Sequence, residues 1–96
     1  MNHTLVFHQE ALDEIQDAHD WYEQQRKGLG LEFMDAIDEV VQRILIKPKS
    51  FPKAFNQRRK ALPARFPYLV VFELYGDVVL VVAVMHASRN PQAVAG

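Results

Sequence analysis

Four side chains in the second half of the sequence have the chemistry to bind an anionic group. Arg59 and Arg65 precede the first of two strongly apolar stretches, and His86 and Arg89 follow the second. Arginine offers a planar fork of N–H donors that matches phosphate or carboxylate oxygens, and histidine transfers protons near neutral pH. We therefore expect these four side chains to converge on a basic platform. His86 is equally compatible with a structural role at a strand end.

Charge is divided unevenly along the chain. Residues 1–46 carry ten acidic and three basic side chains, whereas residues 47–96 carry eight basic and two acidic ones. This segregation predicts one face of concentrated positive potential that binds an anionic target. The alternative is that the cations only protect an edge strand from aggregation. The candidate target-binding residues are Arg58, Arg59, Lys60, Arg65, His86 and Arg89.

The first half of the chain is expected to form a short strand and two helices, which support the sheet that carries this platform. A short strand is expected over residues 3–7, a first helix over residues 8–27, and a second from Leu31 until Pro48, because apolar residues recur at helical spacing. Gly28 and Gly30 are expected to end the first helix, because glycine accepts a left-handed backbone. The short link predicts an antiparallel helix hairpin.

The second half of the chain has the pattern of β-strands. Single strands are expected over residues 54–62, 65–74 and 77–86, with a tight turn at Gly76 and Asp77. The fold class is therefore α+β in the order β-α-α-β-β-β. It has an N-terminal strand, a helix hairpin and a three-stranded antiparallel meander, with the helices packed on one face of the sheet.

Both faces of the last two strands are apolar. Because two helices cover only one face, the other is expected to form an exposed apolar surface of the kind that marks partner binding, unless the twist of the sheet covers it. The first strand places Phe66, Tyr68, Val70 and Phe72 on one face and Leu69 and Val71 on the other. The second places Val79, Val81, Ala83 and Met85 on one face and Leu80, Val82 and Val84 on the other.

Composition narrows the protein classes further. With 96 residues and 49% hydrophobic content, the chain is expected to form one domain over residues 1–96. It contains no cysteine, its start does not resemble a signal peptide, and its apolar run at residues 78–85 is shorter than the roughly 20 residues of a membrane span. A solvated helix face is the interpretation of the helical spacing of Asp13, Asp17 and Asp20. We expect a cytoplasmic protein with no metal, no cofactor and no membrane partner.

Three quoted segments resemble a known family. "WYEQQRKGLGLEFMDAIDEVVQRILIKP", "RRKALPARFPYLVVFEL" and "VVAVMHASRNP" are similar in order and spacing to the RelE/ParE superfamily of bacterial toxins, and closest to its ParE-like branch. The resemblance implies a type II toxin–antitoxin toxin that forms a hetero-oligomer with a cognate antitoxin, whose C-terminal segment wraps over the helix hairpin and sheet. The candidate antitoxin-binding residues are Trp21, Tyr22, Tyr68, Val70 and Phe72, although Trp21 and Tyr22 also suit core packing.

Three functions remain open under this resemblance. The favoured one is a ParE-like toxin that binds DNA gyrase without chemistry of its own. The alternatives are a RelE-like ribosome-dependent endoribonuclease that cuts messenger RNA, with Arg59, Arg65, His86 and Arg89 as catalytic candidates, and a toxin relic that only binds antitoxin. RNA cleavage requires proton transfer at two oxygens, and His86 is the only histidine near the basic strands. The sequence is compatible with both an enzyme and a binding protein.

Overall fold

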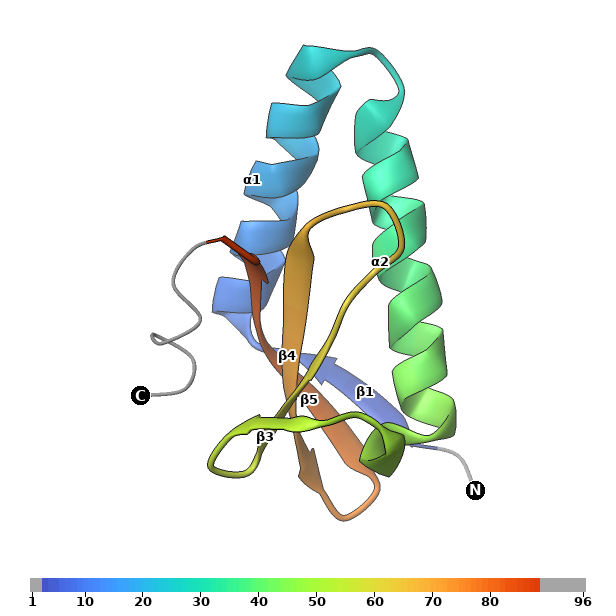
Figure 1. Cartoon of the computed structure of the whole chain (residues 1–96), viewed down its shortest axis with the longest axis vertical. Helices are drawn as coiled ribbons and strands as arrows, with labels where there is room; N and C mark the ends of the chain where they lie inside the picture. Colours follow the sequence, from blue (N-terminus) through green and yellow to red (C-terminus); the bar gives the residue numbers. More distant parts are fainter. Residues whose placement is uncertain (1–2, 89–96) are drawn as a thin grey trace.

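The computed structural model describes residues 3–88, in which a helix hairpin packs on one face of a five-stranded sheet (Figure 1). The strand order is β1-β5-β4-β3-β2, with β1 parallel to β5 and the other neighbours antiparallel. This arrangement confirms the expected α+β fold. Its elements are β1 (Thr4–Phe7), α1 (Gln9–Gln25), α2 (Leu29–Ile46), the 3₁₀ turn η1 (Pro48–Ser50), β2 (Lys53–Phe55), β3 (Arg58–Ala61), β4 (Tyr68–Tyr75) and β5 (Val78–His86).

The two glycines of the helix link have different roles. Gly28 has φ of +90°, a left-handed value that favours glycine, and lies between the helices as expected. Gly30 lies inside α2, so the expectation that it ends the first helix is wrong. A Cβ at position 30 would lie 2.7 Å from the His19 ring, so Gly30 allows α1 and α2 to approach closely at this point.

The segment over residues 54–62 was expected to be one strand, and this expectation is wrong. It forms most of a hairpin in which β2 and β3 pair with each other, with Lys53 opposite Arg59. Asn56 in the connecting turn has φ of +52°, a conformation that asparagine tolerates better than most residues. The hairpin adds β2 to the outer edge of the sheet.

A bulge in β5 changes which side chains face the helices. Val71 pairs with Ala83 and Phe72 pairs with Val81, so Val82 is an extra residue without a partner on β4. The regular alternation expected along β5 is therefore wrong beyond this point. Val84 is 1% exposed and packs in the core, although regular alternation from Val81 would place it on the opposite face.

The core lies between the helix hairpin and the sheet. Phe33 of α2 is fully buried, and its ring centroid lies 5.4 Å from that of Phe66 and 5.2 Å from that of Tyr68. Val70 and Phe72 are also 0% exposed. The expectation that these two residues contact the antitoxin therefore does not fit the fold, because their side chains are covered by α1 and α2.

The opposite face of the sheet is apolar, as expected, but it does not form a large exposed surface. Leu69 and Val71 at its centre are 7% and 1% exposed. Ala54 from β2 and Met85 and Ala87 from the C-terminal side pack against this pair. The centre of this face is therefore covered, whereas Val6 of β1 and Tyr75 of β4, which point to the same face, are 43% and 60% exposed.

Removal of the Phe33 ring should strongly destabilise this core. We expect Phe33→Ala to lower the free energy of unfolding by about 3–5 kcal/mol, because the ring is fully enclosed by other aromatic side chains. Leu31→Ala on the same helix is the matched control, because Leu31 is 64% exposed and should change stability by about 0.5 kcal/mol or less. Urea denaturation measures both. Equal losses in the two variants would contradict this placement of the core.

Candidate functional site

The three described arginines of the candidate target-binding set are engaged in separate interactions. Arg58 Nε donates to a Glu73 carboxylate oxygen at 2.7 Å. Arg59 Nη1 donates to the main-chain oxygen of Phe51 at 2.7 Å. Arg65 Nη2 donates to Glu32 at 2.6 Å and extends the contact between the strands and α2. Each guanidinium therefore joins two parts of the fold.

The sheet register separates the arginines from His86. Arg59 is opposite Phe72 on β4, whereas His86 is opposite Tyr68 at the start of the same strand. Four residues of strand separate these positions by roughly 13 Å. Arg65 is directed to α2 by its ion pair, and Arg89 lies outside the described residues. The expectation that these side chains converge on one platform is wrong for the three that are described.

The contacts of His86 define its tautomer. Its Nδ1 accepts a hydrogen bond from the Ser88 main-chain N–H at 3.1 Å and also lies 2.7 Å from Ser88 Oγ. A backbone N–H can only donate, so in this geometry Nδ1 is unprotonated and Nε2 carries the proton. The ring also packs edge-on against Tyr68, with centroids 5.2 Å apart. The ring of His86 is therefore held by Ser88 and Tyr68 at the end of β5.

Exposed cations collect on a different part of the surface. We call Lys47, Lys49, Lys53, Arg59 and Lys60 the basic edge, because they lie on η1 and the β2–β3 hairpin or directly beside them. The four lysines are exposed, and no salt bridge involves them within residues 3–88. Lys53 and Arg59 are neighbours across the hairpin. The segregation of charge in the sequence thus corresponds to a positive outer edge of the sheet.

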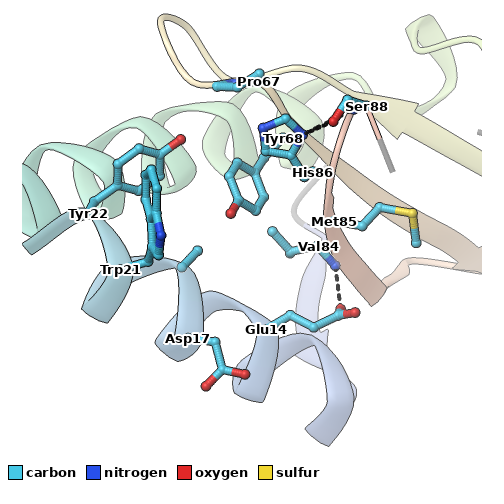
Figure 2. A pocket seen from close by; sticks show the side chains of 11 residues that line it. Glu14, Asp17, Trp21, Tyr22, Pro67, Tyr68, Val84, Met85, His86 and Ser88 are labelled. Atoms are coloured by element: carbon cyan, nitrogen blue, oxygen red, sulfur yellow. Dashed lines mark hydrogen bonds between the residues drawn. The ribbon is translucent and has the colours of Figure 1, made fainter. Parts of the chain in front are cut away.

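A cavity of about 650 Å³ lies between α1 and the C-terminal half of β5, and we call it the α1–β5 groove (Figure 2). Helical spacing brings Glu14, Asp17 and Trp21 to the same side of α1. Tyr68 and His86, the paired residues of β4 and β5, form the opposite wall. The groove is therefore acidic along the helix and aromatic along the sheet.

The groove exists because β1 is shorter than β5. β1 pairs only with residues 78–81, and the His8 main-chain N–H donates to the Val81 carbonyl where β1 ends. Beyond this point a side chain takes the place of a strand, because Glu14 Oε1 accepts from the Val84 main-chain N–H at 2.8 Å. α1 thus lies beside a part of β5 that no described strand pairs on this side.

Sequence reasoning missed this groove. It treated Asp17 as part of a solvated helix face and gave Glu14 no role. The spacing of Glu14, Asp17 and Trp21 is a signal that could have indicated a common side of α1. The matching wall could not be inferred, because the bulge that turns Val84 and His86 toward α1 has no clear signature in an all-apolar strand.

Residues 3–88 hold no group of three or more metal-ligating side chains of the His, Cys, Asp or Glu type. None of the helices in the same residues is long and apolar enough to cross a membrane.

Comparisons with known proteins identify the class of protein. A solved structure titled "Chromosomal ParDE TA system from P. aeruginosa" superposes with a TM-score of 0.79, over 90% of this chain and 97% of that chain, at 16% sequence identity. At that identity the likeness shows the fold alone. The family described as "ParE toxin of type II toxin-antitoxin system, parDE" matches residues 5–91. The chain therefore belongs to the ParE toxin family. A comparison with curated proteins finds no match.

The tautomer of His86 gives a direct test of the site. In long-range ¹⁵N–¹H correlation spectra of the full chain, we expect Nδ1 of neutral His86 to have the shift of an unprotonated nitrogen and Nε2 that of a protonated one. The reason is the hydrogen bond from the Ser88 main-chain N–H to Nδ1. The opposite assignment would contradict the described geometry and would leave Nε2 free to act as a base.

The ion pair between Glu32 and Arg65 should make the free energy of unfolding depend on pH. The hydrogen bond from Arg65, followed by that from Arg26, lowers the pKa of Glu32 below its ordinary value of 4.5. A carboxyl whose pKa is lowered by folding stabilises the protein above the unfolded pKa, and this contribution is lost as the pH falls through the folded pKa.

Glu32→Gln should therefore be less stable than wild type at pH 7, and the difference should shrink as the pH falls below 4.5. Urea denaturation across this range provides the measurement. Glu39→Gln, on an exposed position of the same helix, is the matched control. If the difference in stability between wild type and Glu32→Gln does not change with pH, Glu32 does not stabilise the fold through an ion pair.

Proposed function

We propose that this toxin inhibits growth by binding DNA gyrase and is neutralised by a cognate antitoxin with which it forms a hetero-oligomer. Family membership supports the toxin role. The observation that carries the choice of a binding mechanism is the dispersal of Arg58, Arg59 and Arg65 into three structural interactions. Because gyrase is an enzyme of the bacterial cytoplasm, the proposal places the toxin there.

The geometry around His86 supports binding over RNA cleavage. Cleavage through the 2′-hydroxyl needs a base and an acid beside a phosphate that cations hold in place. His86 Nδ1 already accepts from Ser88, and Glu14 and Asp17 are the charged side chains that line the adjoining groove. Two carboxylates repel a phosphate. An inhibitor that binds a protein target does not require this constellation.

The basic edge is the surface that we propose for the target. Lys60 is exposed on β3, and Arg59, whose side chain points to the other face of the same strand, is held by the Phe51 carbonyl. Arg58 lies next to them, although Glu73 offsets its charge. Gyrase acts on DNA, so its working complex presents an anionic surface that suits these cations. Arg65, His86 and Arg89 belong to the target-binding set only if a second surface takes part.

We propose that the antitoxin covers the aromatic residues of the helix hairpin and of the sheet beside it. Trp21 is 55% exposed, and it lines the α1–β5 groove together with Tyr22 and Tyr68. An exposed tryptophan beside further aromatic rings is typical of a contact that contributes strongly to protein binding. These three residues remain the antitoxin-binding candidates after the removal of the two buried ones.

A supercoiling assay with purified gyrase tests the target. We expect the wild-type chain to inhibit the enzyme, and Lys53→Gln with Lys60→Gln to need about a tenfold higher concentration, because two charges are lost from the contact. Arg26→Gln with Lys27→Gln is the matched control. Both residues lie at the helix link, at the end of the molecule away from the β2–β3 hairpin (Figure 1), and this variant should inhibit like wild type.

Primer extension on abundant transcripts after induction separates the proposal from its enzymatic alternative. We expect messenger RNA to remain uncut while supercoiling is inhibited. Codon-phased cuts that disappear in His86→Ala, with gyrase unaffected, would overturn the proposal in favour of a ribosome-dependent endoribonuclease.

A further inference from the structure

The α1–β5 groove has the chemistry of a site for a cation. Its charged lining residues are Glu14 and Asp17, and no lysine or arginine of the described chain lines it. Within residues 9–25, α1 carries six acidic side chains and no basic one, so the potential along this side is negative.

Aromatic rings complete the groove. Figure 2 shows Trp21 and Tyr68 bordering the same space, with Glu14 and Asp17 on the α1 side. Burial, and then the neighbouring Tyr68, raise the pKa of Tyr22, so its hydroxyl stays protonated at neutral pH. Aromatic faces attract cations through their quadrupole, and the attraction adds to that of nearby carboxylates. A planar guanidinium can stack on a ring and donate to a carboxylate at the same time.

The strand beside the groove favours a polypeptide ligand over a small cation. β5 continues to His86, whereas its pairing with β1 ends at Val81. Within residues 3–88 no strand pairs with residues 82–86 on the side that faces α1. Although Glu14 takes the Val84 N–H on this side, an extended chain can lie along the rim of the groove and direct one side chain into it.

We propose that the α1–β5 groove accepts an arginine side chain of the antitoxin, with the guanidinium stacked on Trp21 and bound by the carboxylates of Glu14 and Asp17. The inference rests on the proposed neutralisation by an antitoxin and adds the chemistry of the contact. It requires a basic residue in an extended part of the partner, next to the part of β5 beyond Val81.

The first experiment tests the groove without an antitoxin. The ¹⁵N-labelled full chain is titrated with N-acetyl-arginine methylamide and, separately, with the uncharged N-acetyl-citrulline methylamide. We expect the arginine probe to shift the Trp21 indole N–H and the Val84 amide saturably in the millimolar range, because a single small contact binds weakly. The citrulline probe should shift them far less. Absent or equal shifts would overturn the inference.

Charge removal supplies the matched comparison. Glu14→Gln with Asp17→Asn should weaken the arginine probe about fivefold or more, since two carboxylates are lost. The side-chain amide oxygen introduced by Glu14→Gln can still accept from the Val84 N–H. Asp38→Asn with Glu39→Gln removes the same charge from exposed positions of α2 and should bind like wild type. Equal weakening in both variants would overturn the inference.

Trp21→Leu provides a second test of the groove in case Glu14→Gln with Asp17→Asn does not fold. Trp21 is 55% exposed, so its replacement should leave the fold intact and still weaken the arginine probe. Arg89→Ala examines the other occupant, because Arg89 follows directly after the groove residue Ser88. Binding of the probe only to Arg89→Ala would mean that the groove serves the chain's own arginine, which would overturn the proposal.

The second experiment uses the antitoxin encoded beside the toxin gene. Titration calorimetry should give at least tenfold weaker binding to Glu14→Gln with Asp17→Asn than to wild type or to the α2 control. Equal binding to all three would overturn the arginine contact and leave neutralisation by the antitoxin intact. If the antitoxin does not bind wild type, the proposed neutralisation is overturned instead. The arginine titration would then still test whether the groove binds a guanidinium.

Discussion

The extra residue at Val82 is the constraint on which the candidate sites depend. Because Val82 has no partner on β4, the strand shifts its alternation by one position, and Val84 enters the core. The same shift places His86 against Tyr68 on the helix side of the sheet. Without the bulge, His86 would face away from α1, and the groove would lose one of its walls. The bulge thus determines which side chains at the end of β5 face α1.

Ion pairs within the fold then determine which charged residues remain available to partners. Arg58 and Arg65 bind Glu73 and Glu32, and Glu32 comes from the acidic half of the sequence. These pairs neutralise the cations nearest the core and connect the sheet to α2. The lysines of the basic edge are left exposed, and so is Asp17 beside the groove. The folded chain therefore keeps the charge segregation of its sequence as two surfaces of opposite sign.

The sequence predicted the features that depend on local pattern. Both helices, the turn at Gly76 and the family follow from periodicity, glycine and ordered motifs, and the structure or the comparisons agree. Features that depend on register were missed. An all-apolar strand carries no sign of the bulge at Val82, and a side chain such as Arg59 can bind a carbonyl as well as a phosphate. The predicted convergence of Arg59, Arg65 and His86 failed for that reason, since convergence is a property of pairing between strands.

The two proposed contact surfaces place a geometric demand on neutralisation. The groove adjoins Tyr68 and His86, whereas the basic edge begins at Arg59 opposite Phe72. These positions are roughly 13 Å apart along β4 and about 10 Å apart across the two strand spacings from β5 to β3. An extended chain covers the combined span of roughly 16 Å with about five residues. A partner segment anchored in the groove can therefore reach the basic edge with a short continuation, provided that this continuation is acidic. An antitoxin that blocks the target surface would then need a basic residue for the groove and acidic residues a few positions away.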